Sequence, residues 1–370
     1  MANTSIWVEG IKGNFDIHIA VVEVMPRGTV VISAEHWGLS AWTKTAKVCV
    51  NLPDGDLTNY FLKCVTGQLA ETLMWGEHHS ASTIEDVSPG FGPAPVGKGD
   101  YYDDAGTHVY FYLMNFHDMD LRNPPDPTEL AASIARLHRN GTSPNGMFGY
   151  PVITGRGSMD RTVIWEKSWA KSFTHLLNDV IKIDSIANEP WSDYDAACKQ
   201  LIDRVLPRLL GALEYNGRSI APTLVHGDIW EGNVATDLET GKIAIFDPGC
   251  LDAHNEMEFS GWRCSWATHF TSPIYQMCYK QDIPPSEPEE EWDDRNRLYA
   301  IRAAICESAG HPGSQLRMIA YNDMLYLCEK YAPLDTLRRY DPEKDISVTG
   351  AIIIQINAIL VIGDKNNIYI

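Results

Sequence analysis

The sequence predicts an α+β fold of two lobes, in which a small N-terminal β-sheet lobe with one helix precedes a larger, mainly helical lobe. Two observations predict this arrangement. Runs rich in β-branched and aromatic residues concentrate before residue 116, whereas helical patterns recur after it. A length of 370 residues also suits two domains or one large two-lobed unit. We therefore expect a first lobe at 1–116, a second at 117–342 and an extension at 343–370.

The first lobe is expected to consist mostly of strands. Pro53-Asp54-Gly55 is a turn signal between two apolar runs and predicts a hairpin. A stretch rich in proline and glycine at 89–99 predicts a loop. The predicted elements are, in order, strands at 29–32, 42–50 and 60–65, a helix at 68–84, the loop at 89–99 and a strand at 108–116.

The second lobe is expected to consist mostly of helices. Pro127 suits the first turn of a helix, on which Leu130, Ile134 and Leu137 share one face. Seven acidic residues without a basic one lie within 282–294, which predicts a solvated connection. The predicted helices are at 127–139, 169–182, 194–216, 260–280, 293–308 and 315–331.

The charge balance excludes a nucleic-acid partner. The chain has 30 Lys and Arg against 49 Asp and Glu, a formal net charge of −19, and no basic run to neutralise a phosphate backbone. Eight scattered cysteines without a Cys-x-x-Cys pair argue against a zinc site or a disulfide framework. Charges at Glu9, Lys12 and Asp16 interrupt any apolar leader, and the longest apolar run, 351–362, is shorter than a membrane span of ~20 residues. We therefore expect a cytoplasmic protein with no membrane partner, whose oligomeric state the sequence does not predict.

The most informative pattern lies between residues 224 and 249. His226-Gly-Asp228 is followed by Asn233, and a short apolar strand then ends at Asp247. This spacing matches a kinase catalytic loop and its metal-binding aspartate. In that chemistry one carboxylate accepts the proton of an attacking hydroxyl, while an amide oxygen and a second carboxylate hold magnesium on the phosphates. Either aspartate alone would be explained as a turn cap or a strand end, but the combination favours catalysis.

Kinase-type phosphoryl transfer also requires a lysine on an upstream strand, paired with a glutamate on a helix. Lys63 stands at a strand centre, where an unpaired ammonium would be costly, and Glu77 on the next helix is its natural partner. Taken singly, each could be a solvated surface residue, but their order before the catalytic loop favours the phosphate role. Met114, Asn115 and Phe116 would form the hinge under the adenine, although apolar sequence there could also be core.

These motifs carry a family resemblance. His-Gly-Asp-x-Trp-x-Gly-Asn, then Asp-Pro, then Ala-His-Asn-Glu-Met-Glu at 253–258 resembles the fructosamine (ketosamine) kinase family, a branch of the aminoglycoside-phosphotransferase and choline-kinase group. Weaker similarity extends from about Gly38 to Tyr331. The resemblance implies a bilobal protein-kinase-like fold, ATP and Mg²⁺ as cofactors, and phosphorylation of the 3-hydroxyl of a ketosamine. Its substrate would be the adduct of a sugar with an amine, free or on a protein, and its role would be deglycation repair.

The resemblance also implies roles for individual residues. Asp228 would be the catalytic base, Asn233 and Asp247 would bind magnesium, and Lys63 with Glu77 would contact the phosphates.

Other residues would support or contact the substrate in the same family pattern. Trp230 would lie beside the sugar-derived substrate, with His254 and Glu256 as further substrate candidates. His226 would brace the catalytic loop. Glu258 is also a substrate candidate, and it would anchor that loop from the following helix.

Three departures from the family pattern stand out. The segment 35–42, which includes Gly38 and Ser40 and would cover the phosphates, has a single glycine where relatives are usually richer. Glycine follows Pro248 in place of the more usual alanine, and Ala253 replaces a glycine.

Two alternatives stay open at this point. One is a phosphotransferase for an aminoglycoside or an amino alcohol, since these acceptors also carry amines that suit acidic surroundings. The other is a pseudokinase that binds nucleotide without turnover, which the glycine-poor phosphate loop suggests.

Overall fold

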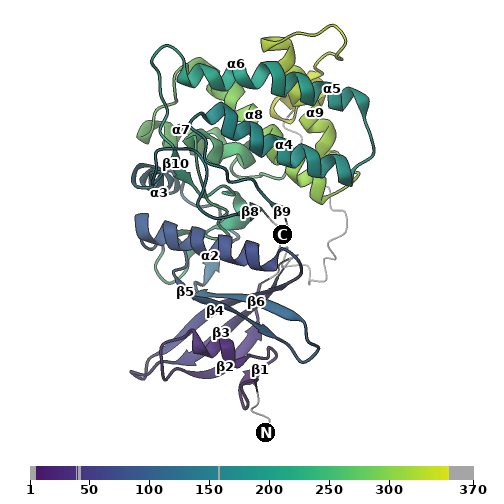
Figure 1. Cartoon of the computed structure of the whole chain (residues 1–370). Helices are drawn as coiled ribbons and strands as arrows, with labels where there is room; N and C mark the ends of the chain where they lie inside the picture. Colours follow the sequence, from purple (N-terminus) through teal and green to yellow (C-terminus); the bar gives the residue numbers. More distant parts are fainter. Residues whose placement is uncertain (1–5, 39, 41–42, 157–158, 350–370) are drawn as a thin grey trace.

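The computed structural model describes residues 6–349, except 39, 41–42 and 157–158. The chain forms two lobes (Figure 1). A β-sheet lies at one end, helices gather at the other, and helix α2 (Ala70–Val87) lies between them. The predicted two-lobed α+β fold is confirmed.

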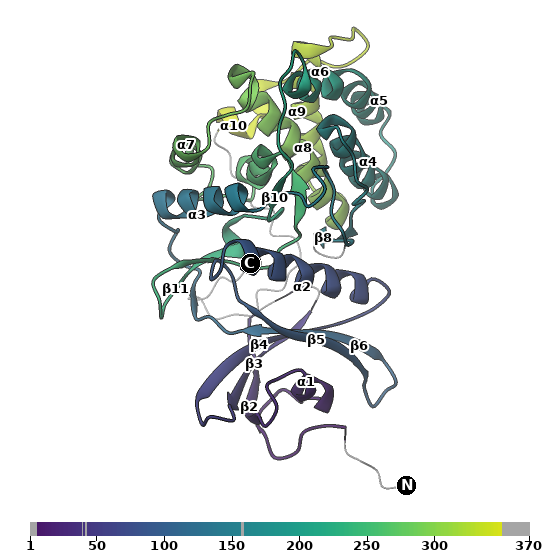
Figure 2. The ribbon, with the colours of Figure 1, turned by 60° about the vertical axis from the view of Figure 1, so that its left-hand side comes forward.

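The N-terminal lobe is built on a six-stranded sheet with the order β1-β2-β3-β4-β6-β5. Neighbouring strands are antiparallel, except that β1 and β2 are parallel. The short helix α1 (Ile19–Glu23) and helix α2 lie on opposite faces of the sheet (Figure 2), so both faces are covered. The strands are β1 (Lys12–Gly13), β2 (Val30–His36), β3 (Lys44–Asn51), β4 (Leu57–Thr66), β5 (Pro95–Tyr102) and β6 (His108–Asn115).

The strands predicted at 29–32, 42–50, 60–65 and 108–116 correspond to β2, β3, β4 and β6, and the helix predicted at 68–84 corresponds to α2. The predicted hairpin is also confirmed. Strands β3 and β4 pair antiparallel with Lys44 opposite Cys64, and Gly55 in the connecting turn has a φ of 94°.

The predicted loop at 89–99 is wrong in its second half, where β5 begins. The glycines that suggested a loop are needed for close packing instead. A Cβ at Gly97 would lie 2.7 Å from Cβ of Val24, and a Cβ at Gly99 would lie 2.7 Å from Cζ of Phe111. Side chains from neighbouring elements therefore fill the space that larger residues would occupy.

The C-terminal lobe contains the long helices. Those predicted at 127–139, 169–182, 293–308 and 315–331 correspond to α3, α4, α8 and α9, and the run predicted at 194–216 is helical but passes through a π-helical turn. The helices are α3 (Pro127–Asn140), α4 (Trp169–Ala187), α5 (Ser192–Gln200), η1 (Leu201–Val205), α6 (Leu206–Gly211), η2 (Ala212–Glu214), η3 (Glu231–Asn233), η4 (Asn255–Arg263), α7 (Pro273–Asp282), η5 (Glu289–Glu291), α8 (Trp292–Gly310), α9 (Leu316–Tyr331), η6 (Pro342–Lys344) and α10 (Ile346–Thr349). Short strands accompany them: β7 (Met119–Asp120), β8 (Gly155–Arg156), β9 (Met159–Asp160), β10 (Thr223–Val225), β11 (Val234–Asp237), β12 (Ile243–Ile245) and β13 (Leu251–Ala253).

The single helix predicted at 260–280 is wrong. The 3-10 helix η4 ends at Arg263, an irregular segment follows at 264–272, and α7 begins at Pro273. Proline has no N–H to donate and its ring clashes with the preceding helical turn, so it fits the first turn of a helix and not the interior.

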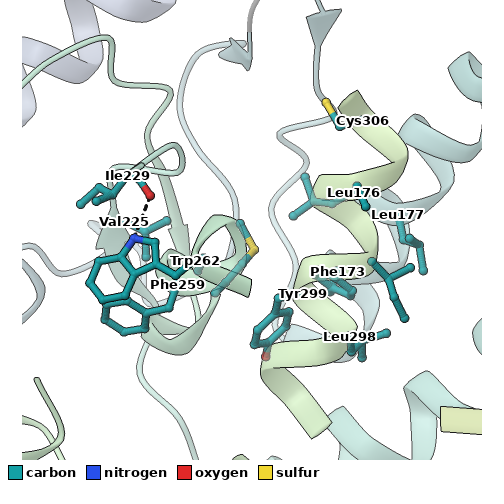
Figure 3. Close-up of a cluster of buried hydrophobic side chains, with 14 of the residues drawn as sticks. Phe173, Leu176, Leu177, Val225, Ile229, Phe259, Trp262, Leu298, Tyr299 and Cys306 are labelled. Carbon is teal, nitrogen blue, oxygen red and sulfur yellow. Dashed lines mark hydrogen bonds between the residues drawn. The ribbon is translucent and has the colours of Figure 1, made fainter. Parts of the chain in front are cut away.

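Helix α8 lies at the centre of the C-terminal lobe and is buried along most of its length. Leu298 and Tyr299 belong to the same apolar core as Phe173 and Leu176 of α4 (Figure 3). The rings of Phe173 and Tyr299 meet edge to face, with centroids 5.1 Å apart.

The acidic segment at 282–294 is in part the solvated connection that its charges predicted, because Glu287, Glu289 and Glu290 are exposed. Four of its seven carboxylates form ion pairs with helices around it. The pairs are Asp282 with Arg139, Glu291 with Arg208, Asp293 with Arg263, and Asp294 with Lys330. The segment therefore fastens α7 and α8 to neighbouring helices.

The described part of the C-terminal extension ends at Thr349. Asp345 is buried there and pairs with Arg297 of α8 at 2.8 Å, which attaches this part to the lobe. The isoleucine-rich run at 351–362 lies outside the described residues. In the described ranges, every helix is too short or too polar to cross a membrane.

Candidate active site

Lys63 is the electrostatic centre of the region between the lobes. Strand β4 directs its side chain toward α2, where it is 8% exposed. Its Nζ donates to Oε1 of Glu77 at 2.6 Å and to the carboxylate of Asp247. Burial would lower the pKa of Lys63, but the carboxylates of Asp247 and Glu77 outweigh it and hold that pKa above its usual value. Lys63 is therefore a charged ammonium that ties α2 to the segment after β12.

Asp247 has an unusual backbone conformation. Its φ is 56°, a left-handed value that costs non-glycine residues about 1–3 kcal/mol and is frequent at functional sites. The side chain contacts Lys63 and is still 49% exposed. A half-exposed carboxylate beside a buried ammonium remains open to a second ligand.

The loop after β10 is held from both sides. The two carboxylate oxygens of Glu258 accept the main-chain N–H groups of His226 at 2.7 Å and Gly227 at 2.9 Å. Nε2 of His226 lies 3.0 Å from the carbonyl of Phe246 and must carry the proton, which leaves Nδ1 to accept the N–H of Asp228 at 3.3 Å. Burial lowers the pKa of His226, which favours this neutral ring. Such contacts are those that a bracing His226 and an anchoring Glu258 would make.

Asn233 lies beside Asp228 in the same loop. Its Nδ2 donates to the carbonyl oxygen of Asp228 at 3.0 Å and to Oδ2 of that residue at 3.2 Å. The N–H of Phe246 donates to the carbonyl of Asn233 at 3.1 Å, which keeps the chain before Asp247 close to this loop. Because Nδ2 is engaged, Oδ1 of Asn233 is the amide atom that could bind a cation. Amide and carboxylate oxygens are ligands that Mg²⁺ prefers, so Asn233 and Asp247 fit this ion.

A pocket lies between α2, β6 and the segment that follows β12. Its lining includes Ile84, Tyr112, Met114, Phe246 and the carboxylate-bearing residues of the Lys63 ion pairs. The predicted nucleotide residue Met114 therefore contributes to a pocket next to the charged centre.

The predicted hinge residues Asn115 and Phe116 use their main-chain donors within the protein. The N–H of Asn115 donates to the carbonyl of Ala94 at 2.9 Å, and the N–H of Phe116 donates to the carbonyl of Asn59 at 3.2 Å. These donors belong to the sheet and are not offered to a base. The ring of Phe116 makes the more distinctive contact, because Nζ of Lys47 lies 4.2 Å from its centroid.

Gly38 and Ser40 lie in the turn between β2 and β3. Gly38 has a φ of 76°, and Oγ of Ser40 accepts the N–H of Thr43 at 3.1 Å. The turn leads directly into Thr45, which is opposite Lys63 in the sheet. The predicted phosphate-covering segment therefore borders Lys63, while its residues 39, 41 and 42 lie outside the described residues.

The structure does not place His254, Glu256 and Glu258 where a substrate could touch them, because their exposed fractions are 0%, 1% and 2%. Nδ1 of His254 lies 2.9 Å from the hydroxyl of Tyr299. Glu256 accepts two hydrogen bonds from Arg295, at 2.7 and 2.9 Å. We therefore correct the substrate prediction for these residues, which hold buried parts of the lobe together.

Trp230 follows the predicted catalytic residue by two positions and is partly buried. A Cβ at Gly232 would lie 2.4 Å from Cζ2 of this indole, so the glycine allows the ring to fold back on its own loop. Behind the loop, Nε1 of Trp262 donates to the carbonyl of Ile229 at 3.0 Å (Figure 3). Trp262 is 1% exposed and belongs to the apolar core of the lobe.

Sequence reasoning missed the hairpin β8–β9 and the arginine that follows it. Nη2 of Arg161 donates to the carbonyl of Gly155 at 2.8 Å. A Cβ at Gly249 would lie 2.3 Å from that carbonyl oxygen and 2.5 Å from Nη2, and a Cβ at Gly227 would lie 3.2 Å from Nη1. The guanidinium of Arg161 therefore lies against the backbone of the loops that carry Asp228 and Asp247. The unexpected glycine at 249 was the one signal in the sequence that another part of the chain packs closely against this loop.

The segment before this hairpin also contacts α2 without an intervening side chain. A Cβ at Gly76 would lie 2.4 Å from the carbonyl oxygen of Ile153. Gly76 immediately precedes Glu77, so the segment links the helix that carries this glutamate to the loops that carry Asp228 and Asp247.

Comparison with known proteins finds similar kinases. A sequence model of the fructosamine kinase family matches residues 43–312. A chloroplastic protein-ribulosamine 3-kinase from Oryza sativa subsp. japonica is 26% identical over 247 residues, which is 66% of each protein, so the chain spans just under two thirds of that relative. The corresponding protein of Arabidopsis thaliana is 29% identical over 259 residues, 68% of this chain and 72% of the relative. The crystal structure of a Thermobifida fusca protein provisionally named fructosamine-3-kinase shares the fold, with a TM-score of 0.62, 18% identity and coverage of 84% of this chain and 98% of that chain.

Replacing Gly249 by alanine is expected to destabilise the protein by about 1–3 kcal/mol, because the added methyl group overlaps main-chain atoms of the β8–β9 hairpin. Thermal unfolding measures the change. Gly211→Ala is the matched control, since nothing lies within 4 Å of its Cβ and alanine favours a helix. Equal unfolding temperatures for Gly249→Ala and the parent chain would contradict the close contact.

Proposed function

The chain belongs to the fructosamine kinase family, and on that premise we propose that it is an ATP-dependent phosphotransferase acting on the 3-hydroxyl of a ketosamine. The acceptor would be a fructosamine or ribulosamine adduct, free or on a protein. The observation that carries the proposal is the buried ammonium of Lys63, which pairs with Glu77 and Asp247 next to the loop of Asp228.

The proposed reaction uses these residues as follows. Asp228 accepts the proton of the acceptor hydroxyl while the hydroxyl oxygen attacks the γ-phosphorus. The bond from that phosphorus to the ADP oxygen breaks, and its electron pair leaves with ADP. Asn233 holds the carboxylate of Asp228 through Nδ2. Lys63, fixed by Glu77, offers its ammonium to phosphate oxygens. Mg²⁺, held by Asn233 and Asp247, would neutralise charge on the phosphates.

The acidic composition supports an acceptor that carries an amine. A net charge of −19 favours cationic partners, and the amine of a ketosamine is protonated at neutral pH. Local positive charge for the nucleotide still comes from Lys63. An aminoglycoside or an amino alcohol is the second acceptor class, because such compounds carry the same charge. Against a pseudokinase stands the joint presence of Asp228, Asn233 and Asp247, of which Asp247 pairs with this lysine.

We assign nucleotide binding to residues 1–116 and the catalytic and acceptor groups to 117–342. A reducing compartment such as the cytoplasm suits the eight cysteines, all of which are free thiols.

Purified protein is expected to phosphorylate fructosyl-lysine and ribulosyl-lysine with ATP and Mg²⁺, measured as ADP release and as a phosphorylated product. Asp228→Ala is expected to lower kcat by about a hundredfold to ten-thousandfold, because the general base is lost. Asp335→Ala is the control, because it replaces an exposed side chain far from Asp228 in sequence. Turnover of aminoglycosides alone would replace the acceptor class, and absence of turnover on both classes would refute the phosphotransferase proposal.

ATP with Mg²⁺ is expected to raise the unfolding temperature, by the equivalent of about 2.7 kcal/mol at a hundredfold excess over Kd. Most of this protection should vanish in Asp247→Ala, because one oxygen ligand of the cation is removed, whereas Asp335→Ala should keep it. Differential scanning fluorimetry with and without Mg²⁺ measures the effect. Full protection of Asp247→Ala would rule out the metal role of that residue.

A further inference from the structure

One side chain of the catalytic loop holds a second loop. Glu231 follows Asp228 by three positions, and its Oε1 accepts three consecutive main-chain N–H groups. The donors are Thr268 at 2.6 Å, His269 at 2.5 Å and Phe270 at 2.9 Å. Hydrogen bonds to an ionised acceptor are stronger than neutral ones, and successive N–H groups that converge on one point form an anion-binding nest.

The second oxygen of the Glu231 carboxylate is in an unfavourable environment. Oε2 of Glu231 is buried and accepts no hydrogen bond from the described residues. A buried acceptor without a donor is unfavourable, and such atoms in native structures call for an explanation. Holding the turn at 268–270 explains why a carboxylate stands at this position.

The same turn is fixed from its other side. The ring of Phe270 packs against Trp262, with centroids 4.8 Å apart, and against Tyr275, with centroids 4.9 Å apart. Trp262 in turn donates to the carbonyl of Ile229 (Figure 3). The turn is therefore tied to the catalytic loop at positions 229 and 231, on either side of Trp230.

Asn233 and Glu231 connect the catalytic loop to two different parts of the protein. Asn233 contacts the segment of Phe246 and Asp247, which leads to Lys63. Glu231 connects the loop to residues 264–272 instead.

From this geometry we infer that Glu231 is a positioning residue for the acceptor. It holds the turn at 268–270, where the exposed side chains of Thr268 and His269 meet the ketosamine. A hydroxyl and an imidazole are suited to hydrogen-bond the sugar-derived hydroxyl groups of such an acceptor. The inference rests on the proposed function, because it names the acceptor side of the same site.

Steady-state kinetics of the full chain test this inference with Glu231→Ala, Glu231→Gln and His269→Ala. Glu231→Ala is expected to raise KM for fructosyl-lysine by about tenfold to a hundredfold, as displaced positioning groups do, while KM for ATP stays unchanged. Glu231→Gln should restore part of the loss, because an amide oxygen can still accept from the turn. His269→Ala changes an exposed side chain and should raise KM for the acceptor without affecting folding.

Glu214→Ala is the matched control. Glu214 also accepts hydrogen bonds at the start of a structural element, from Oγ of Ser168 at 2.8 Å and the N–H of Trp169 at 3.0 Å. Its loss should lower the unfolding temperature and leave both KM values unchanged. A similar result for Glu231→Ala, or an equal rise of both KM values, would overturn the positioning role.

Hydrogen exchange separates this inference from the proposed function. Amides 268–270 should exchange faster in Glu231→Ala than in the parent chain, whatever the activity of either. Unchanged exchange would overturn the inference even if the protein phosphorylates ketosamines. If Glu231→Ala exchanges faster but the parent chain phosphorylates no ketosamine, Glu231 still holds the turn. That result would refute both the proposed function and the acceptor role.

Discussion

The arrangement of the two lobes depends on the ion pairs of the buried Lys63 ammonium with Glu77 and Asp247. Taking one charge out of water is costly, and here carboxylates from two different parts of the chain compensate it. Glu77 comes from the helix that covers the sheet, and Asp247 comes from the loop after β12. The left-handed backbone at Asp247 and the hydrogen bond from Phe246 to Asn233 then align the loop of Asp228 and Asn233 with this centre. A single desolvated charge thereby connects the groups that the proposed phosphoryl transfer would use.

The parts of the site that could be predicted from the sequence are those that local spacing determines. The loop of Asp228 and Asn233 spans a few residues, so its geometry follows from one turn and two flanking strands. Lys63 was recognisable because a charged side chain in the middle of an apolar strand needs a partner, and the next helix offers Glu77. Strands and helices with clear periodicity were predictable for the same reason: their pattern is local.

The rest depends on partners that are distant in sequence. Glu256 looked available to a substrate, yet Arg295, 39 positions later, buries it in an ion pair. Net charge alone likewise gave no indication that the acidic segment at 282–294 pairs with basic residues on other helices. Gly97 gave a loop signal, although it is required because Val24 packs closely against it. Pro273 stands in the first turn of α7, so the break between η4 and α7 did have a local signal in the sequence.

The β8–β9 hairpin and the segment before it have a consequence for how this sequence can diverge. A Cβ at Gly76 would meet the carbonyl oxygen of Ile153, and a Cβ at Gly249 would meet the carbonyl oxygen of Gly155 and the guanidinium of Arg161, so added volume at either glycine presses on the main chain of this segment. A mutation that adds a methyl group at either glycine can be accepted only if the hairpin shifts, and that shift alters the fit at the second glycine. Positions 76 and 249 are therefore expected to change together in evolution, although 173 residues separate them.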